Sequence, residues 1–191
     1  MPTSPYNILV SPATGIWLAP VGEAYPLINV APAGNWVSLG RTDGGVKVKN
    51  LNKITDHMLD QVLMPVKRTR TAVGVEVTCP LAEITLEVYA KVLNNVTVTT
   101  VAAGAGTAGY KYFTLGSTVD VSQFAMLIRG PSPYMDANLQ YELKCVSQGA
   151  EPELEFTSAK KAILNTVWSA LEDPSVAGSM GRVVAEHAAP I

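Results

Sequence analysis

Three glycines spaced as in a phosphate-binding loop are the first residues whose pattern could support chemistry. Gly104, Gly106 and Gly109 form G-x-G-x-x-G directly after a stretch whose alternation predicts a β-strand. A dinucleotide site also requires a helix starting at the third glycine, because the free N–H groups of that helix hold the pyrophosphate. Residues 110–116 instead alternate, are rich in aromatic side chains and end in glycine, which predicts a second strand. We therefore expect residues 103–109 to form a loop joining two strands.

Other arrangements of reactive side chains are weaker still. His57 and His187 are the only histidines of the sequence, and neither has cysteines or carboxylates at metal-ligand spacing. Cys79 could pair with His57 as a thiolate nucleophile, but its strand pattern places Cys79 on a buried face and favours a structural role. Glu83 and Glu87 share one side of a predicted helix, where a solvated face is a simpler interpretation than a general-acid pair. We expect no catalytic residue, no metal and no cofactor, and hence no enzyme.

Charge is balanced overall but uneven along the chain. The 191 residues carry a formal net charge of −2, which does not predict a nucleic-acid coat or a membrane-surface protein. Seven of the fourteen basic residues nevertheless lie within one stretch that holds only three acidic residues. These basic residues are Arg41, Lys47, Lys49, Lys53, Lys67, Arg68 and Arg70. The stretch is either a solvated face or a patch that meets an acidic partner surface.

The chain is expected to be a soluble protein made in a cytoplasm. No run approaches 18 uninterrupted apolar residues, so no membrane span is predicted. No basic residue precedes an apolar run near the N-terminus, so no signal peptide is predicted either. Cys79 and Cys145 each lie in an alternating run and are expected to be buried, reduced thiols.

The hydrophobic pattern predicts one β-rich domain with extended ends. Six prolines within residues 1–34 oppose sheet structure and favour an extended N-terminal arm. Residues 35–173 form the domain, and the Gly-, Ala- and Ser-rich residues 174–191 predict a flexible C-terminal arm. One helix is expected at about residues 85–94, because Thr85 can cap it and amphipathic spacing follows.

Two later segments differ in the clarity of their pattern. Residues 136–146 alternate cleanly and predict a strand. Its expected inward side chains are Ala137, Leu139, Tyr141, Leu143 and Cys145, and its expected outward side chains are Asn138, Gln140, Glu142 and Lys144. Residues 160–172 are ambiguous, since their apolar positions follow helical spacing although several residues also suit a strand.

A long segment between two predicted strands is the strongest functional candidate. Residues 50–67 are too long for an ordinary hairpin connection, so we expect a long loop. Its apolar side chains are Ile54, Met58, Leu59, Val62, Leu63 and Met64, followed by the basic Lys67, Arg68 and Arg70. The apolar residues must be buried somewhere, either within the loop itself as an Ω-loop or on another subunit.

Four motifs carry a resemblance to a known family. They are WVSLGRTDGGVKV, TDHMLDQVLMPVKRTRT, VEVTCPLAEITLEVYAKVL and VWSALEDPS. In this order they resemble the opening hairpin, long loop, strand-to-helix junction and final strand of the major tail tube proteins of long-tailed bacteriophages. The motifs cover residues 36–94 and 160–175. The resemblance favours a strand over a helix for residues 160–172.

The resemblance implies a mainly β, sandwich- or barrel-like tail tube fold with one flanking helix, a long loop and extended terminal arms. Six such subunits close into a ring whose inner strands join into a barrel, and rings stack into a hollow tube. Barrel closure agrees with the physics of sheets, because it removes exposed strand edges. The resemblance assigns ring-stacking contacts to residues 50–67, with Lys67, Arg68 and Arg70 in adjacent polar contacts.

The implied partners are further copies of the chain, a tape-measure protein, and tail-tip or terminator proteins. DNA would pass through the lumen without specific binding, so lumen side chains are expected to be acidic or neutral. The implied location is the phage tail of the virion, after assembly in the cytoplasm of the host bacterium.

Other functions remain open. The tube or needle protein of a contractile injection or secretion system is expected to share this fold. A β-sandwich binding module, such as a glycan-binding virion decoration, predicts exposed aromatic side chains on one face. A nucleotide-binding enzyme predicts a helix after Gly109.

Overall fold

The computed structural model describes residues 13–60, 62–93, 97–116, 121–134, 138–156 and 161–187, with only the backbone of Val62 and Leu63. These residues form eleven strands and one helix, which confirms the prediction of a mainly β protein. The strands are β1 (Gly15–Pro20), β2 (Val37–Ser38), β3 (Lys47–Leu59), β4 (Val62–Leu81), β5 (Thr99–Val101), β6 (Tyr110–Tyr112), β7 (Gln123–Pro131), β8 (Asn138–Gln148), β9 (Glu153–Leu154), β10 (Leu164–Ala170) and β11 (Gly181–Ala185). The helix is α1 (Leu86–Val92).

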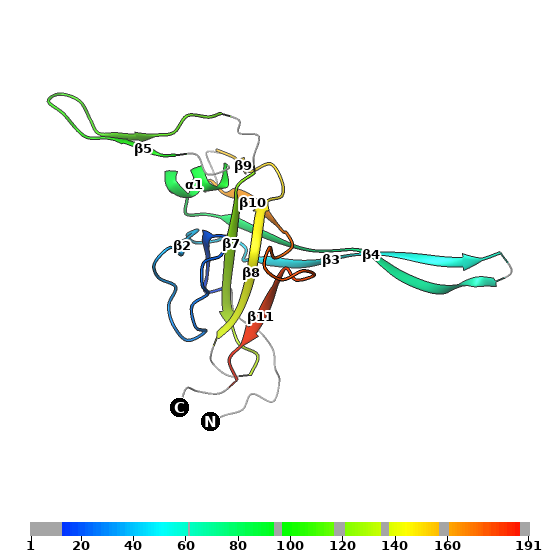
Figure 1. Cartoon of the computed structure of the whole chain (residues 1–191). Helices are drawn as coiled ribbons and strands as arrows, with labels where there is room; N and C mark the ends of the chain where they lie inside the picture. The colour runs from blue at the N-terminus through cyan, green and yellow to red at the C-terminus, as the bar shows by residue number, and fades with distance from the viewer. Residues whose placement is uncertain are drawn as a thin grey trace.

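Nine of the strands form one antiparallel sheet (Figure 1). Its order from edge to edge is β2-β1-β7-β8-β10-β4-β3, while β11 pairs with β8 and β9 pairs with β10. Strands β5 and β6 form a separate two-stranded sheet. Buried side chains of β1, β7 and β8 pack in the same hydrophobic cluster as those of β4 and β10. The sheet therefore curls around a shared core.

Trp168 on β10 lies at the centre of that core. Its side chain is fully buried and meets the ring of Phe124 edge-on, with 6.1 Å between the ring centroids. The indole N–H donates to Thr166 Oγ1 at 3.2 Å, so the polar end of the side chain is satisfied. Cys79 and Cys145 are buried and free, as the sequence predicted.

Helix α1 closes one end of the core and confirms the helix predicted at about residues 85–94. Thr85 is its N-cap, and Thr85 Oγ1 accepts a hydrogen bond from the Val88 N–H at 3.3 Å. Val88 and Val92, one turn apart, are buried against the sheet residues of the core cluster.

The prediction of an extended arm over residues 1–34 is wrong for β1, which lies inside the sheet. β1 pairs with β7 along its whole length and with β2 on its other edge. Ile16 and Leu18 alternate along the strand and are buried, and Pro20 stands only at its last position. The prolines that predicted an extended arm therefore do not interrupt β1. Residues 1–12 of the predicted arm lie outside the described residues.

The prediction of a flexible C-terminal arm over residues 174–191 is wrong for β11, which pairs with β8. Gly181 has a φ of +149°, and a Cβ atom there would lie 2.0 Å from the Glu142 carbonyl oxygen. Only glycine permits this approach of the two strands. A strand of five residues is too short to show a clear alternation of apolar and polar side chains. Its conformation depends on pairing with the neighbouring strand β8. Residues 188–191 lie outside the described residues.

Strand β10 confirms the strand that the resemblance predicted within residues 160–172. It contradicts the helix that the spacing of the apolar residues suggested there. β10 pairs with β4 on one edge and with β8 and β9 on the other. Leu164, Thr166 and Trp168 are buried on one face, while Val167 is partly buried on the opposite face. Partial burial of both faces produced an apolar pattern that also fits a helix.

The glycine-rich segment joins two strands, as predicted. Gly104 and Thr107 form an isolated bridge between β5 and β6, and Gly106 has a φ of +75°. Strand β6 follows Gly109, so the helix N-terminus required for a dinucleotide site is not formed there.

Candidate functional site

The segment predicted as a long loop over residues 50–67 is a β-hairpin, which corrects that prediction. Strands β3 and β4 pair from Lys47 with Thr78 outward to Leu59 with Val62, with two register shifts on the way. The outer part of the hairpin has almost no buried side chain, so no alternation of apolar and polar residues reveals the strands. These residues are identified as strands only by the backbone pairing of β3 with β4.

The outer half of this hairpin projects from the body as an arm (Figure 1). We define the arm as residues 52–73, which begin and end at the paired Asn52 and Val73. The stretch of β3 within it corresponds to roughly 25 Å of extended chain. Six exposed apolar side chains of the arm are Ile54, Met58, Leu59, Met64, Val66 and Val73. An isolated two-stranded ribbon is marginally stable in water, and these exposed apolar side chains make the arm a candidate contact surface.

Strand alternation gives the arm two different faces. Ile54 and Asp56 project from one face of β3, and Arg70 and Arg68, which pair with Ile54 and Asp56, lie on the same face. We call this the Arg70 face. The opposite face carries Thr55, His57, Lys67 and Thr69. Met58 follows two residues after Asp56, at a register shift of the hairpin. The Arg70 face combines exposed apolar and cationic side chains, a combination suited to an apolar surface with nearby carboxylates.

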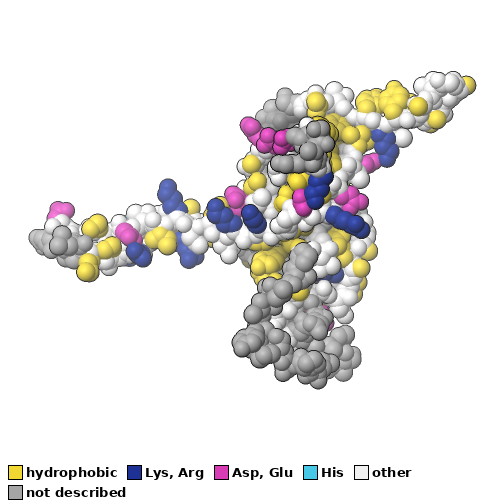
Figure 2. Space-filling model, turned by 180° about the vertical axis from the view of Figure 1, so that it is seen from behind, with side chains coloured by type: hydrophobic (Ala, Val, Ile, Leu, Met, Phe, Trp, Pro, Cys, Tyr) yellow, Lys and Arg dark blue, Asp and Glu magenta, His cyan; other side chains and the backbone are white. Residues whose placement is uncertain are grey.

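Only some of the charges on the arm are neutralised within the chain. Arg68 Nε and Nη2 donate to the two oxygens of the Asp56 carboxylate at 2.7 and 3.2 Å. Both side chains are substantially exposed, so this ion pair stabilises the fold little. Among the described residues, neither Lys67 nor Arg70 has a charged partner. Figure 2 shows the row of basic side chains along the arm.

The predicted contact residues all lie on the arm. Those with described side chains are Ile54, Met58, Leu59, Met64, Lys67, Arg68 and Arg70, and all are exposed. The side chains of Val62 and Leu63 lie outside the described residues. Val66 and Val73 were not among the predicted contact residues, although both are exposed on the arm; Val73 lies beyond the expected loop, whereas Val66 lies within it.

The residues considered for catalysis are separated or have structural partners. His57 Nε2 lies 2.7 Å from Thr69 Oγ1 on the arm, whereas Cys79 is buried in the body. Burial raises the pKa of the Cys79 thiol, which keeps it protonated. Lys111 Nζ donates to Glu87 at 2.6 Å, and this hydrogen bond lowers the pKa of Glu87. No group of three His, Cys, Asp or Glu side chains in the described part of the chain could hold a metal ion.

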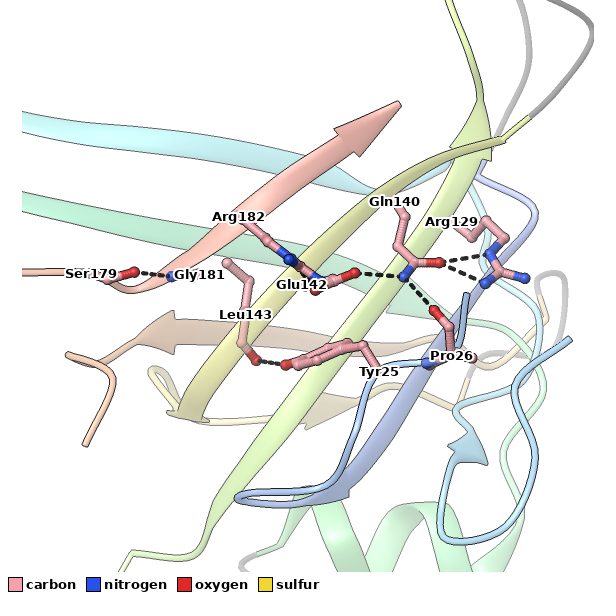
Figure 3. Close-up of polar contacts among 9 residues, drawn as sticks. All are labelled: Tyr25, Pro26, Arg129, Gln140, Glu142, Leu143, Ser179, Gly181 and Arg182. Carbon is pink, nitrogen blue, oxygen red and sulfur yellow. Dashed lines mark hydrogen bonds and ion pairs between the residues drawn. The ribbon is translucent and has the colours of Figure 1, made fainter. Parts of the chain in front are cut away.

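One face of β8 differs from the prediction, because its expected outward residues Gln140 and Glu142 are buried. Gln140 Nε2 donates to Glu142 Oε1 at 2.8 Å and to the carbonyl of Pro26 at 3.1 Å. Arg129 donates to Gln140 Oε1 from Nη2 and Nε, and Arg182 Nε donates to Glu142 Oε2 (Figure 3). These four side chains form a continuous polar row across β7, β8 and β11.

Residues 21–36 cover this polar row, and their backbone explains the burial of polar side chains. Arg129 donates to the carbonyls of Val30 and Leu27 at 2.7 and 3.2 Å, and Asn138 donates to that of Ile28 at 3.1 Å. Alternation in a sequence assigns side chains to the two faces of a strand. It does not reveal that residues 21–36 cover one face of β8 and supply backbone carbonyls to its buried polar side chains.

A surface hollow opens near the end of β4 that is remote from the tip of the arm. It is lined by Asp43, Pro80, Glu153, Glu155, Lys161, Ile163 and Asn165. Lys161 Nζ lies 2.8 Å from Asp43 Oδ1 across it. Phe156, the residue after Glu155, is 81% exposed. The hollow thus has an acidic lining and an exposed aromatic side chain adjacent in sequence.

Comparison with protein-family models gives no match for the chain, and comparison with curated proteins gives none either. Within the described ranges, no helix has the length and apolar character needed to cross a membrane. The arm and the hollow are two surface features of the described residues that are candidates for a functional role.

Proposed function

We propose that this protein is a structural subunit that assembles with copies of itself into stacked six-membered rings, forming the hollow tail tube of a bacteriophage. The observation that carries the proposal is the arm, a long ribbon with exposed apolar side chains at its tip. Met58, Leu59 and Met64 are each more than half exposed in the single chain. Such a surface is typical of a protein that buries it in an assembly.

The edges of the sheet also support assembly. Among the described strands, β2 and β3 stand at the two ends of the main strand order. Each presents backbone N–H and C=O groups that a neighbouring strand can pair with. A cyclic arrangement of subunits lets one edge meet another and continues the sheet around a ring.

The resemblance in four motifs gives the assembly its biological role. By that resemblance the tube carries the genome from the virion into the host, without enzymatic activity and without specific DNA binding. Its partners are the tape-measure protein and the tail-tip or terminator proteins. The tube of a contractile injection or secretion system requires the same kind of subunit, and co-assembly with a sheath protein distinguishes it.

Electron microscopy of the purified protein at high concentration tests the proposal. We expect rings or hollow tubes from the natural sequence. The informative variant replaces residues 54–71 by Asn-Gly, which joins the paired residues Lys53 and Ala72 through a two-residue turn. Circular dichroism should show an unchanged β fold, and tubes should be absent. Tubes of normal appearance from this variant would refute the role of the arm.

One observation favours a second candidate, a glycan-binding decoration of the virion. Tyr110 and Tyr112 are exposed on β6, and their ring centroids lie 5.9 Å apart. Exposed aromatic rings are suited to stacking on sugars. Trp36 and Trp168 are buried and cannot contribute. Glycan-array binding that is lost in a Tyr110→Ala, Tyr112→Ala variant, without any tube formation by the natural chain, would support this function instead.

A further inference from the structure

The arm and the hollow lie near opposite ends of one strand. β4 begins at the tip of the arm and reaches the hollow at Pro80. Arg70 on the arm and Pro80 are ten residues apart in this strand, which corresponds to roughly 33 Å. The Arg70 face therefore cannot reach the hollow of its own chain. Any contact between the two surfaces joins two copies of the protein.

The two surfaces carry opposite charge. The arm, residues 52–73, holds four basic and two acidic residues, a formal charge of +2. The lining of the hollow holds three acidic residues and one basic residue, a formal charge of −2. In the hollow, Asp43 already pairs with Lys161, whereas Glu153 and Glu155 are exposed and have no charged partner among the described residues. Complementary unpaired charges favour the correct register between two molecules.

The apolar side chains of the two surfaces are also complementary. Ile54 lies on the Arg70 face, and Met58 follows it four residues nearer the tip; they are 55% and 61% exposed. Phe156 follows Glu155, a lining residue of the hollow, and its ring is exposed. A methionine side chain is flexible and makes favourable contacts with the edge of an aromatic ring. Docking would remove all three apolar side chains from water together.

We propose that the Arg70 face of one copy docks at the hollow of a second copy, with Arg70 against Glu153 and Glu155, and with Met58 against Phe156. This inference rests on the proposed function and identifies the surface that receives the arm. The contact is heterologous, since the surfaces differ and lie near opposite ends of β4. A heterologous contact that does not close into a ring repeats in one direction and builds an open stack.

Charge reversal tests the ionic part of the contact. Arg70→Glu and Glu155→Arg should each raise the protein concentration needed for tubes by about tenfold or more, because like charges then face each other. The double variant should return close to the natural value. Lys67→Glu is the matched control, because it makes the same charge change on the opposite face. Glu155→Arg should not rescue Lys67→Glu. Circular dichroism should show the same fold for all five variants.

Disulfide crosslinking tests the geometry independently. Both natural cysteines are buried, so Met58→Cys combined with Phe156→Cys adds the only exposed thiols among the described residues. Oxidised tubes of this variant should give a ladder of covalent multimers, whereas each single variant should give none beyond dimers. Tubes without a ladder, or single charge variants that assemble normally or are not rescued in the double variant, would overturn the inference and leave the proposed function standing. Absence of rings and tubes from the natural chain would overturn both.

Discussion

Arg182 Nε on β11 donates to Glu142 Oε2 on β8 at 2.6 Å, and it is the only cation described in an ion pair with this buried carboxylate. Glu142 is 2% exposed, whereas Arg182 extends into solvent. The amide of Gln140 supplies the other described hydrogen bond to the carboxylate. The pair therefore attaches the last described strand to the centre of the sheet.

We predict that Arg182→Ala lowers the free energy of unfolding by about 2 kcal/mol, because a buried carboxylate loses a charged hydrogen-bond partner. Urea denaturation followed by circular dichroism measures this. Arg68→Ala is the matched control, since Arg68 makes a similar Nε contact of 2.7 Å to the exposed Asp56. That control should change the free energy of unfolding by less than about 0.5 kcal/mol. Equal losses in both variants would contradict the prediction.

Tyr25 should make stability decline at alkaline pH. Its hydroxyl donates to the Leu143 carbonyl at 2.6 Å, and burial together with the nearby Glu142 charge raises its pKa well above the usual value. The folded protein therefore keeps the phenol neutral at a pH at which the unfolded chain ionises it. This contribution is complete below about pH 10, the pKa of an unperturbed tyrosine, and decreases as the pH rises further.

The free energy of unfolding, measured by urea denaturation between pH 8 and 12, tests this expectation. The slope above about pH 10 should be shallower in Tyr25→Phe than in the natural chain. Tyr112→Phe, which changes an exposed tyrosine, is the matched control for the substitution. An identical slope in the natural chain and Tyr25→Phe would show that Tyr25 ionises in the folded state.

Met58→Glu should separate assembly from folding. The side chain is mostly exposed in the single chain, so we expect the free energy of unfolding to change by less than about 0.5 kcal/mol. Assembly should be lost, because a carboxylate would enter an apolar contact without a partner. Sedimentation of polymer and chemical denaturation of the soluble fraction measure the two effects. A stable variant that still forms tubes would exclude Met58 from the interface.

Trp168→Ala should test the centre of the core. Loss of this fully buried side chain leaves a cavity beside Phe124 and should cost about 3–5 kcal/mol of unfolding free energy. Phe156→Ala removes an exposed ring and should cost less than about 0.5 kcal/mol. Thermal and urea unfolding compare the two. A small loss for Trp168→Ala would mean that the core collapses to fill the cavity.

Local signals predicted part of the fold well. Thr85 and the spacing of Val88 and Val92 located α1, because a cap and a helical period depend only on nearby residues. The alternation of residues 136–146 located β8 for the same reason. The glycines around Gly106 predicted a connection between two strands, since their neighbours alternate on both sides.

Features that depend on distant residues were predicted poorly. β1 and β11 are short, and their pairing with β7 and β8 decided their conformation. The arm was expected to be a loop, because neither of its faces is buried in the single chain. Gln140 and Glu142 were expected to face solvent, because the sequence around them contains no signal that residues 21–36 cover them.

The sequence by itself determined the mainly β class, the helix, and the apolar and basic residues that a partner could contact. These follow from residue type and short-range spacing, which act along the chain. Only the tertiary structure decided that these contact residues form a projecting arm, that the acidic hollow lies near the opposite end of β4, and that a polar row is buried under residues 21–36. Such arrangements depend on pairing and burial between residues far apart in sequence, and no local period encodes them.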